Sequence, residues 1–143
     1  MVAEEVISRF ENGAPSGCVN LLFFDRTDGE TEGSYYIHGQ KKDFENDTEF
    51  LVKSLRDLAA DIEWGEPPLI DLEIHPCERA LRMPRYVKPG EFLCFPSLEI
   101  LGFIPPVKIE MTYFVEPKFA GVEECFLCET DDEYVLLYWY TTG

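Results

Sequence analysis

Three ionisable side chains alternate with apolar ones in the short stretch Leu69 to His75. Asp71, Glu73 and His75 occupy every second position of this stretch. Alternate residues of an extended strand share one face, so the pattern places two carboxylates beside an imidazole, a combination suited to general acid–base chemistry. The same pattern is typical of an ordinary strand with one solvent-exposed face. We favour this second interpretation and predict no catalytic residue.

Cysteine and histidine suggest a second kind of chemistry, metal ligation. Cys125 and Cys128 form a CxxC pair, and His75 and Cys77 lie two residues apart. Four such ligands could hold a tetrahedral zinc ion. However, the CxxC lies in an apolar run typical of a strand, in which residues three apart point to opposite faces. We therefore predict no metal ligand, no cofactor and five reduced thiols.

The charge of the chain limits the class of partner. The sequence has 28 acidic and 12 basic residues, which gives a formal net charge of -16. Such a charge disfavours contact with nucleic acid or with an anionic membrane and favours a basic protein as partner. No apolar run has the roughly 20 residues needed to span a bilayer, and the first ten residues carry two glutamates instead of the basic start of a secretory signal. We expect a soluble, cytoplasmic protein.

Acidic residues gather in three places: 25–32, 43–49 and 123–133. Carboxylates beside exposed aromatic rings suit the recognition of a basic protein surface. The alternative is that the aromatic run 134–141 is a central strand buried on both sides. On the first interpretation, the partner-binding residues lie at the tips of two hairpins and are Asp28, Glu30, Glu32, Asp131, Asp132, Glu133 and Tyr134.

One long amphipathic helix is predicted at 46–64. Its apolar positions recur every three or four residues, which places them on one stripe. Asn46 followed by Glu49 has the spacing of a capping box, and Gly65 and the prolines after it end the helix. The stripe consists of Leu51, Leu55, Leu58 and Ile62.

The rest of the chain predicts strands and one more helix. A short helix is expected at 1–12. Alternating or compact apolar runs bounded by turn residues indicate strands, and we expect a first hairpin with a long acidic tip at 25–33. The predicted strands are 18–24, 34–38, 69–75, 107–115, 123–129 and 134–141. Together these predict a single α+β domain over 1–143, with a mainly antiparallel sheet, one long central helix and a short N-terminal helix.

Two functional hypotheses follow. The first is a non-catalytic acidic module that binds a basic protein, as an inhibitor or an immunity-type protein would do; this is an analogy of class. The second is a small enzyme or ligand-binding domain with a pocket between helix and sheet. Its polar groups would come from Asp71, Glu73 and His75 or from the basic segment 79–88. The sequence has no GxSxG, HExxH, P-loop or GxGxxG motif, so we favour the first.

Overall fold

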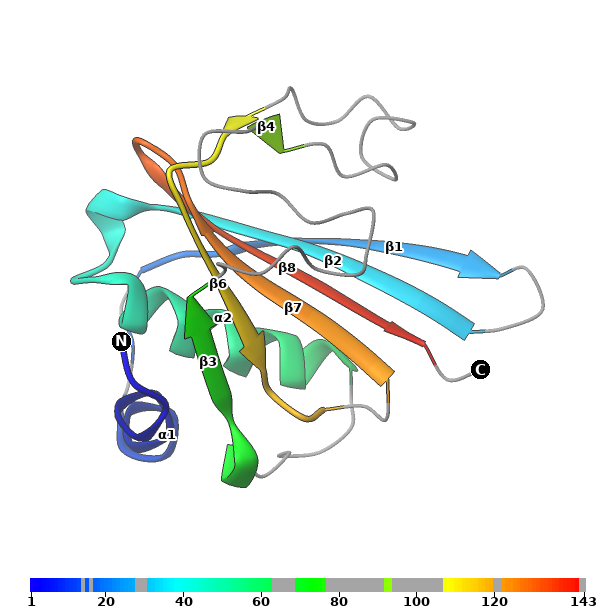
Figure 1. Ribbon diagram of the computed structural model, residues 1–143, viewed down its shortest axis with the longest axis horizontal. Coiled ribbons are helices and arrows are strands. Elements are labelled where there is room, and N and C mark those ends of the chain that lie inside the picture. Colours follow the sequence, from blue (N-terminus) through cyan, green and yellow to red (C-terminus); the bar gives the residue numbers. More distant parts are fainter. Residues whose placement is uncertain are drawn as a thin grey trace.

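Six antiparallel strands form the main sheet, and a helix lies across one of its faces (Figure 1). The computed structural model describes residues 1–13, 15, 17–27, 31–62, 69–76, 92–93, 107–119 and 122–141. The helices are α1 (Ala3–Asn12) and α2 (Asp47–Ile62), with short 3-10 helices η1 (Lys41–Asp43) and η2 (Leu69–Asp71). The strands are β1 (Asn20–Thr27), β2 (Thr31–Gln40), β3 (Glu73–Pro76), β4 (Phe92–Leu93), β5 (Val107–Lys108), β6 (Met111–Glu116), β7 (Val122–Glu129) and β8 (Glu133–Thr141).

The main sheet has the strand order β1-β2-β8-β7-β6-β3, and every pairing in it is antiparallel. The short strands β4 and β5 form a separate antiparallel pair. Within the described residues, the α+β class and the antiparallel sheet are therefore confirmed. The terminal hairpin β7–β8 is also confirmed, and β8 lies in the interior of the sheet.

Helix α2 forms because its apolar residues share one face. Phe50, Leu51, Leu55 and Leu58 are fully buried, as the helical spacing predicts. Asn46 Oδ1 accepts the backbone N–H of Glu49 at 3.1 Å, so the predicted N-cap is confirmed. Helix α2 has 16 residues, and the predicted single long central helix over 46–64 is not confirmed. Residues 63 and 64 lie outside the described part of the chain.

The first hairpin is longer than predicted and its tip is shorter. The strands β1 and β2 remain paired to Thr27 and Thr31, and Arg26 lies opposite Glu32. The predicted tip, 25–33, is thus largely strand. Polar residues can extend a ladder because its hydrogen bonds come from the backbone.

The predicted strand 69–75 is a helical turn followed by a short strand. Leu69–Asp71 forms η2, whose turn closes with the Leu72 N–H donating to the Leu69 carbonyl at 3.2 Å. Leu69 and Leu72 are both buried. Residues three apart lie on the same side of a 3-10 turn. The turn therefore places both Leu69 and Leu72 in the core.

The predicted strand 107–115 is also divided. Val107–Lys108 pairs with β4, while β6 begins at Met111 in the main sheet. Ile109, between them, is fully buried, but the side chain of Met111 is 45% exposed. The predicted strand 107–115 is therefore not one continuous strand, because the chain changes sheets between Lys108 and Met111.

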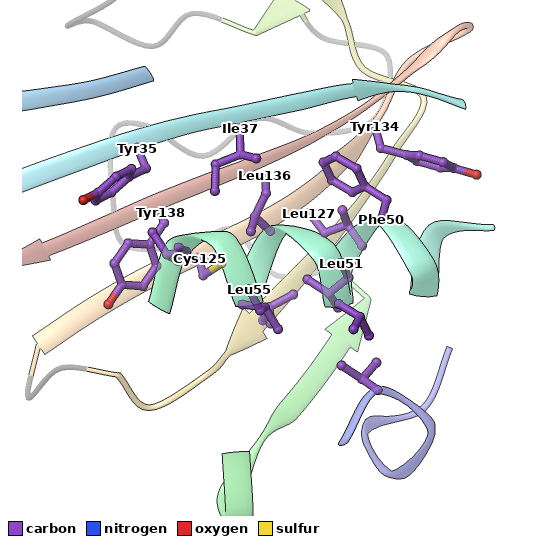
Figure 2. Packing of buried hydrophobic residues seen from close by; sticks show 14 of the residues in the cluster. Tyr35, Ile37, Phe50, Leu51, Leu55, Cys125, Leu127, Tyr134, Leu136 and Tyr138 are labelled. Carbon is purple, nitrogen blue, oxygen red and sulfur yellow. The ribbon is translucent and has the colours of Figure 1, made fainter. Parts of the chain in front are cut away.

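The core lies mainly between α2 and the sheet (Figure 2). Tyr134, Leu136 and Tyr138 of β8 point toward α2, and Tyr138 is fully buried. Val135 and Leu137 alternate with them and are also buried. β8 is thus a central strand buried on both faces, as one of the two interpretations of its sequence predicted.

Glycine allows a close aromatic contact at Gly39 of β2. A Cβ added there would lie 2.8 Å from the buried ring of Phe44. We expect Gly39→Ala to lower the free energy of unfolding by about 1–3 kcal/mol, because the extra methyl overpacks the core. Gly33→Ala is the matched control, since the three atoms nearest to its added Cβ are outer atoms of the Tyr140 side chain, which is only half-buried, whereas Phe44 is buried. Equal losses in urea unfolding would contradict this distinction.

Candidate functional site

The turn between β7 and β8 presents two carboxylates on a well-bonded backbone. Asp131 and Asp132 are exposed. Thr130 closes the turn twice: its N–H donates to the Glu133 carbonyl at 2.9 Å, and its Oγ1 accepts the Glu133 N–H at 2.9 Å. The two aspartates are therefore held at a defined end of the sheet.

Two other parts of the chain that carry carboxylates lie beside this turn. The backbone N–H of Lys41 donates to the Asp132 carbonyl at 2.9 Å, and the Glu110 N–H donates to the Glu129 carbonyl at 2.8 Å. These contacts bring the start of the segment 43–49 and Glu110 beside the β7–β8 turn. We call the exposed carboxylates at this place the acidic end; they are Asp43, Glu45, Glu110, Asp131 and Asp132.

A lysine and a histidine contact two carboxylates of this region. Lys41 Nζ lies 2.5 Å from Glu129 Oε1, and His38 Nδ1 lies 2.8 Å from Glu133 Oε2. Burial lowers the pKa of Lys41, but its hydrogen bond to Glu129 and the charge of that carboxylate outweigh burial, so the net shift is upward. Glu129 and Glu133 are thus engaged within the fold. Asp131 and Asp132 are exposed, and Asp132 Oδ1 accepts a hydrogen bond from the Thr130 hydroxyl at 3.4 Å.

Tyr134, predicted to contact a partner, belongs mostly to the core. Its side chain is only 8% exposed. Its ring lies 5.4 Å from that of Phe50 and 6.4 Å from that of Phe44, measured between centroids. The amino group of Lys41 covers it at 5.6 Å. A partner at the turn would meet little of this ring.

Glu32, which was predicted to bind a partner together with Asp28 and Glu30, does not join the acidic end. Asp28 and Glu30 lie outside the described residues, and Glu32 is described only as part of β2. In the ladder, Glu32 pairs with Thr141, while Glu133 pairs with Gln40. Eight residue steps along β8 separate these pairs, about 26 Å at ~3.3 Å per residue. Glu32 and Glu133 therefore lie at opposite ends of the sheet.

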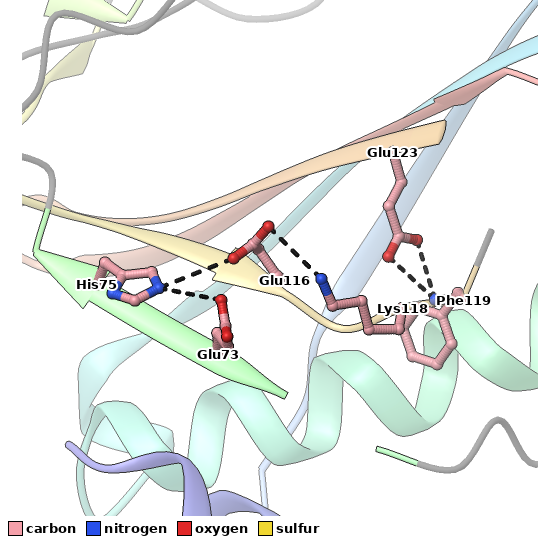
Figure 3. A network of polar contacts seen from close by, with 6 residues as sticks. All are labelled: Glu73, His75, Glu116, Lys118, Phe119 and Glu123. Atoms are coloured by element: carbon pink, nitrogen blue, oxygen red, sulfur yellow. Dashed lines mark hydrogen bonds and ion pairs between the residues drawn. The ribbon is translucent and has the colours of Figure 1, made fainter. Parts of the chain in front are cut away.

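A second cluster lies where β3 pairs with β6 (Figure 3). Glu73 stands directly opposite Glu116. His75 Nε2 lies 3.4 Å from Glu73 Oε2 and 3.7 Å from Glu116 Oε2. Lys118 Nζ contacts the other oxygen of Glu116 at 3.6 Å. Glu73 and His75, predicted to share a face, do so; Glu116 completes the group, which we call the carboxylate–histidine cluster (Glu73, His75 and Glu116).

The two carboxyl groups of this cluster differ in their pKa values. Hydrogen bonds to Glu116 and to His75 lower the pKa of Glu73. Burial and the hydrogen bond to Glu73 raise the pKa of Glu116. As the pH falls, a proton therefore goes first to Glu116, as expected of two carboxylates that share a site.

The structure changes the membership that the sequence suggested for this group. Asp71 lies in η2, outside β3, so it is not on the strand face of Glu73 and His75. Glu116 was not a candidate, because its position opposite Glu73 depends on strand pairing across more than 40 residues. The sequence did contain one signal for this residue, because Glu116 is a carboxylate directly after the predicted strand 107–115.

The CxxC pair cannot bind one metal ion. Cys125 lies opposite Tyr138, on the face toward α2, whereas Cys128 lies opposite Val135, on the other face. Both side chains are buried, and burial raises the pKa of Cys125. The opposite orientations that the strand period predicts are confirmed. Cys77 lies outside the described residues.

A comparison of the chain with protein-family models, curated proteins and solved structures finds no match. Within the described residues, neither α1 nor α2 combines the length and apolarity that a membrane-crossing helix needs. The acidic end and the carboxylate–histidine cluster are therefore the features of the described residues that indicate a function.

Proposed function

We propose that the protein is a non-catalytic acidic binding module in the cytoplasm that neutralises a basic protein, as an inhibitor or immunity-type protein does. The observation that carries this proposal is the convergence of three chain segments on the acidic end. The backbone hydrogen bonds of Lys41 to Asp132 and of Glu110 to Glu129 bring Glu110 and the segment with the exposed Asp43 and Glu45 to the end of the sheet where the β7–β8 turn lies. A charged patch on a fixed backbone favours a partner of opposite charge without the cost of ordering a loop.

Electrostatic steering would bring the partner to this surface. The net charge of -16 attracts a basic protein over several ångströms at low salt. Asp131 and Asp132 would then make the closest contacts, since Glu129 and Glu133 already have basic neighbours. Inhibition would follow from occlusion of the partner's basic site.

The test reverses the charge of the turn. In Asp131→Lys/Asp132→Lys, the fold should remain intact, because exposed charges contribute little to stability. We leave Glu133 unchanged because it contacts His38. Association with a basic protein captured from the native host should slow about tenfold at low salt, and the difference should shrink as salt screens the charges. The measurement is association rate against ionic strength.

Glu4→Lys/Glu5→Lys is the matched control, because it makes the same charge change on the exposed side of α1. It should slow association less than the turn variant does. Equal slowing by the two variants would show that only net charge matters, and unchanged rates in the turn variant would remove the acidic end as the binding surface.

The alternative is a small enzyme or ligand-binding domain with a pocket beside α2. The ionisable side chains of β3 do not line such a pocket. Ile74 of β3 and Val115 of β6 pack on the helix side. Glu73, His75 and Glu116 alternate with them, so these three side chains face away from α2. The basic segment 79–88, which the sequence also suggested for such a pocket, lies outside the described residues.

A further inference from the structure

We propose that the carboxylate–histidine cluster binds a divalent first-row transition metal ion such as Zn²⁺. The proposal departs from the sequence-based expectation of no metal ligand. It is independent of the acidic end, because it concerns different residues on the β3–β6 edge of the sheet.

The spacing of the donor atoms suits a small ion. A tetrahedral ion with ligand bonds of about 2.0–2.1 Å requires neighbouring ligand atoms to lie roughly 3.3 Å apart. His75 Nε2 lies 3.4 Å from one carboxylate oxygen and 3.7 Å from the other. One ligand atom from each residue lies within 4.8 Å of the other two. Figure 3 shows Nε2 directed toward both carboxylates, so small side-chain rotations would complete the three ligands.

The backbone holds these ligands in place. Glu73 and Glu116 occupy directly paired positions of an antiparallel ladder, and His75 lies two residues along the same face from Glu73. Like charges directly opposite one another destabilise a strand pair. A cation between them would offset this repulsion and link the short edge strand β3 to β6.

The donor set indicates the class of metal. Mg²⁺ and Ca²⁺ prefer oxygen ligands alone, whereas an imidazole with carboxylates suits zinc and its neighbours in the first transition row. Two carboxylates also match the charge of a divalent ion. Three protein ligands leave a coordination position for water, as in zinc sites that remain open.

Lys118 is the competing cation. Its ammonium group lies 3.6 Å from Glu116 Oε1, while Glu116 Oε2 faces the imidazole. The two oxygens thus have different neighbours, and a metal ion would use the one on the histidine side. Because His75 is 57% exposed, an ion can reach the site directly from solvent.

The test is calorimetric titration of the chelator-treated full chain with zinc chloride. We expect one equivalent of zinc to bind, with an affinity at least tenfold weaker in His75→Gln and in Glu116→Gln. His38→Gln is the matched control and should keep the wild-type affinity, since His38 lies beside Glu133 and not in the cluster. All variants carry Cys18→Ser, which removes the exposed thiol among the described cysteines.

Two results would overturn the proposal. One is the absence of saturable zinc binding to the wild-type cluster in the Cys18→Ser background. The other is binding that both His75→Gln and Glu116→Gln leave unchanged, which would place the ion elsewhere. The substituted side chains are exposed or partly exposed, so the folded state should persist, and a circular dichroism spectrum of each variant checks this.

Discussion

Replacing Leu55 by alanine is expected to lower the free energy of unfolding by about 2–5 kcal/mol. Leu55 lies in the middle of α2, fully buried against the sheet (Figure 2). The substitution removes apolar contacts and leaves a cavity, while alanine keeps the helix propensity high. The loss therefore reports the packing between helix and sheet. Urea unfolding of wild type and variant, followed by circular dichroism, measures it.

Lys53→Ala is the control on the same helix. Lys53 is partly exposed, and its ammonium pairs with Asp57 one turn later at 3.0 Å. Such a pair is worth only about 0.2–0.5 kcal/mol, so the control should change stability little. A loss below about 0.5 kcal/mol for Leu55→Ala would mean that the stripe is not the core.

The parts of the fold that the sequence predicts well depend on local spacing. The three- and four-residue steps of Leu51, Leu55 and Leu58 predict a helix with one buried face, and all three are buried. Asn46 and Glu49 predict the N-cap contact that forms. In both cases the residues that decide the structure lie within one or two turns of each other.

The candidate sites were harder to predict because they depend on distant pairings. Glu116 joins Glu73 and His75 only through the register between β6 and β3. The acidic end forms because Lys41 bonds to the backbone of Asp132, although 90 residues separate them in the chain. Composition identified the acidic segments, but local patterns hold no information on which of them meet.

Tyr134 shows how sequence adjacency can mislead. It follows three consecutive carboxylates, which suggested an exposed aromatic contact. In β8, however, alternate residues point toward α2, and Tyr134 begins that series with Leu136 and Tyr138. The alternation of side chains along β8 therefore determines that Tyr134 is buried, although an exposed turn precedes it.

The stability of the protein is expected to fall steeply above about pH 10 because buried tyrosines resist ionisation in the fold. Tyr138 is fully buried, and its hydroxyl donates to Glu123 Oε2 at 2.5 Å. Burial and the hydrogen bond to Glu123 raise its pKa far above the ordinary value of 10.0. Tyr36, on the opposite face of the sheet, also has a raised pKa, caused by burial and the charge of Glu133.

The sign of the effect follows from proton binding. Above about pH 10 the unfolded chain loses these protons, while the folded protein keeps them. Each tyrosine then lowers the free energy of unfolding by about 1.4 kcal/mol per pH unit, until the pH reaches its pKa in the fold. Below about pH 10 both states keep the proton, so the stabilising contribution is fully present there.

Tyr138→Phe tests this prediction. The variant loses one hydrogen bond, so it should be less stable at neutral pH by about 0.5–3 kcal/mol. Between about pH 10 and about pH 11.5, its free energy of unfolding should fall less steeply than that of the wild type, by about 1.4 kcal/mol per pH unit. Val135→Ala, a buried control without a titrating group, should lower stability and keep the wild-type slope. Denaturant unfolding at a series of pH values gives both slopes, and equal slopes for Tyr138→Phe and wild type would show that Tyr138 ionises within the folded protein.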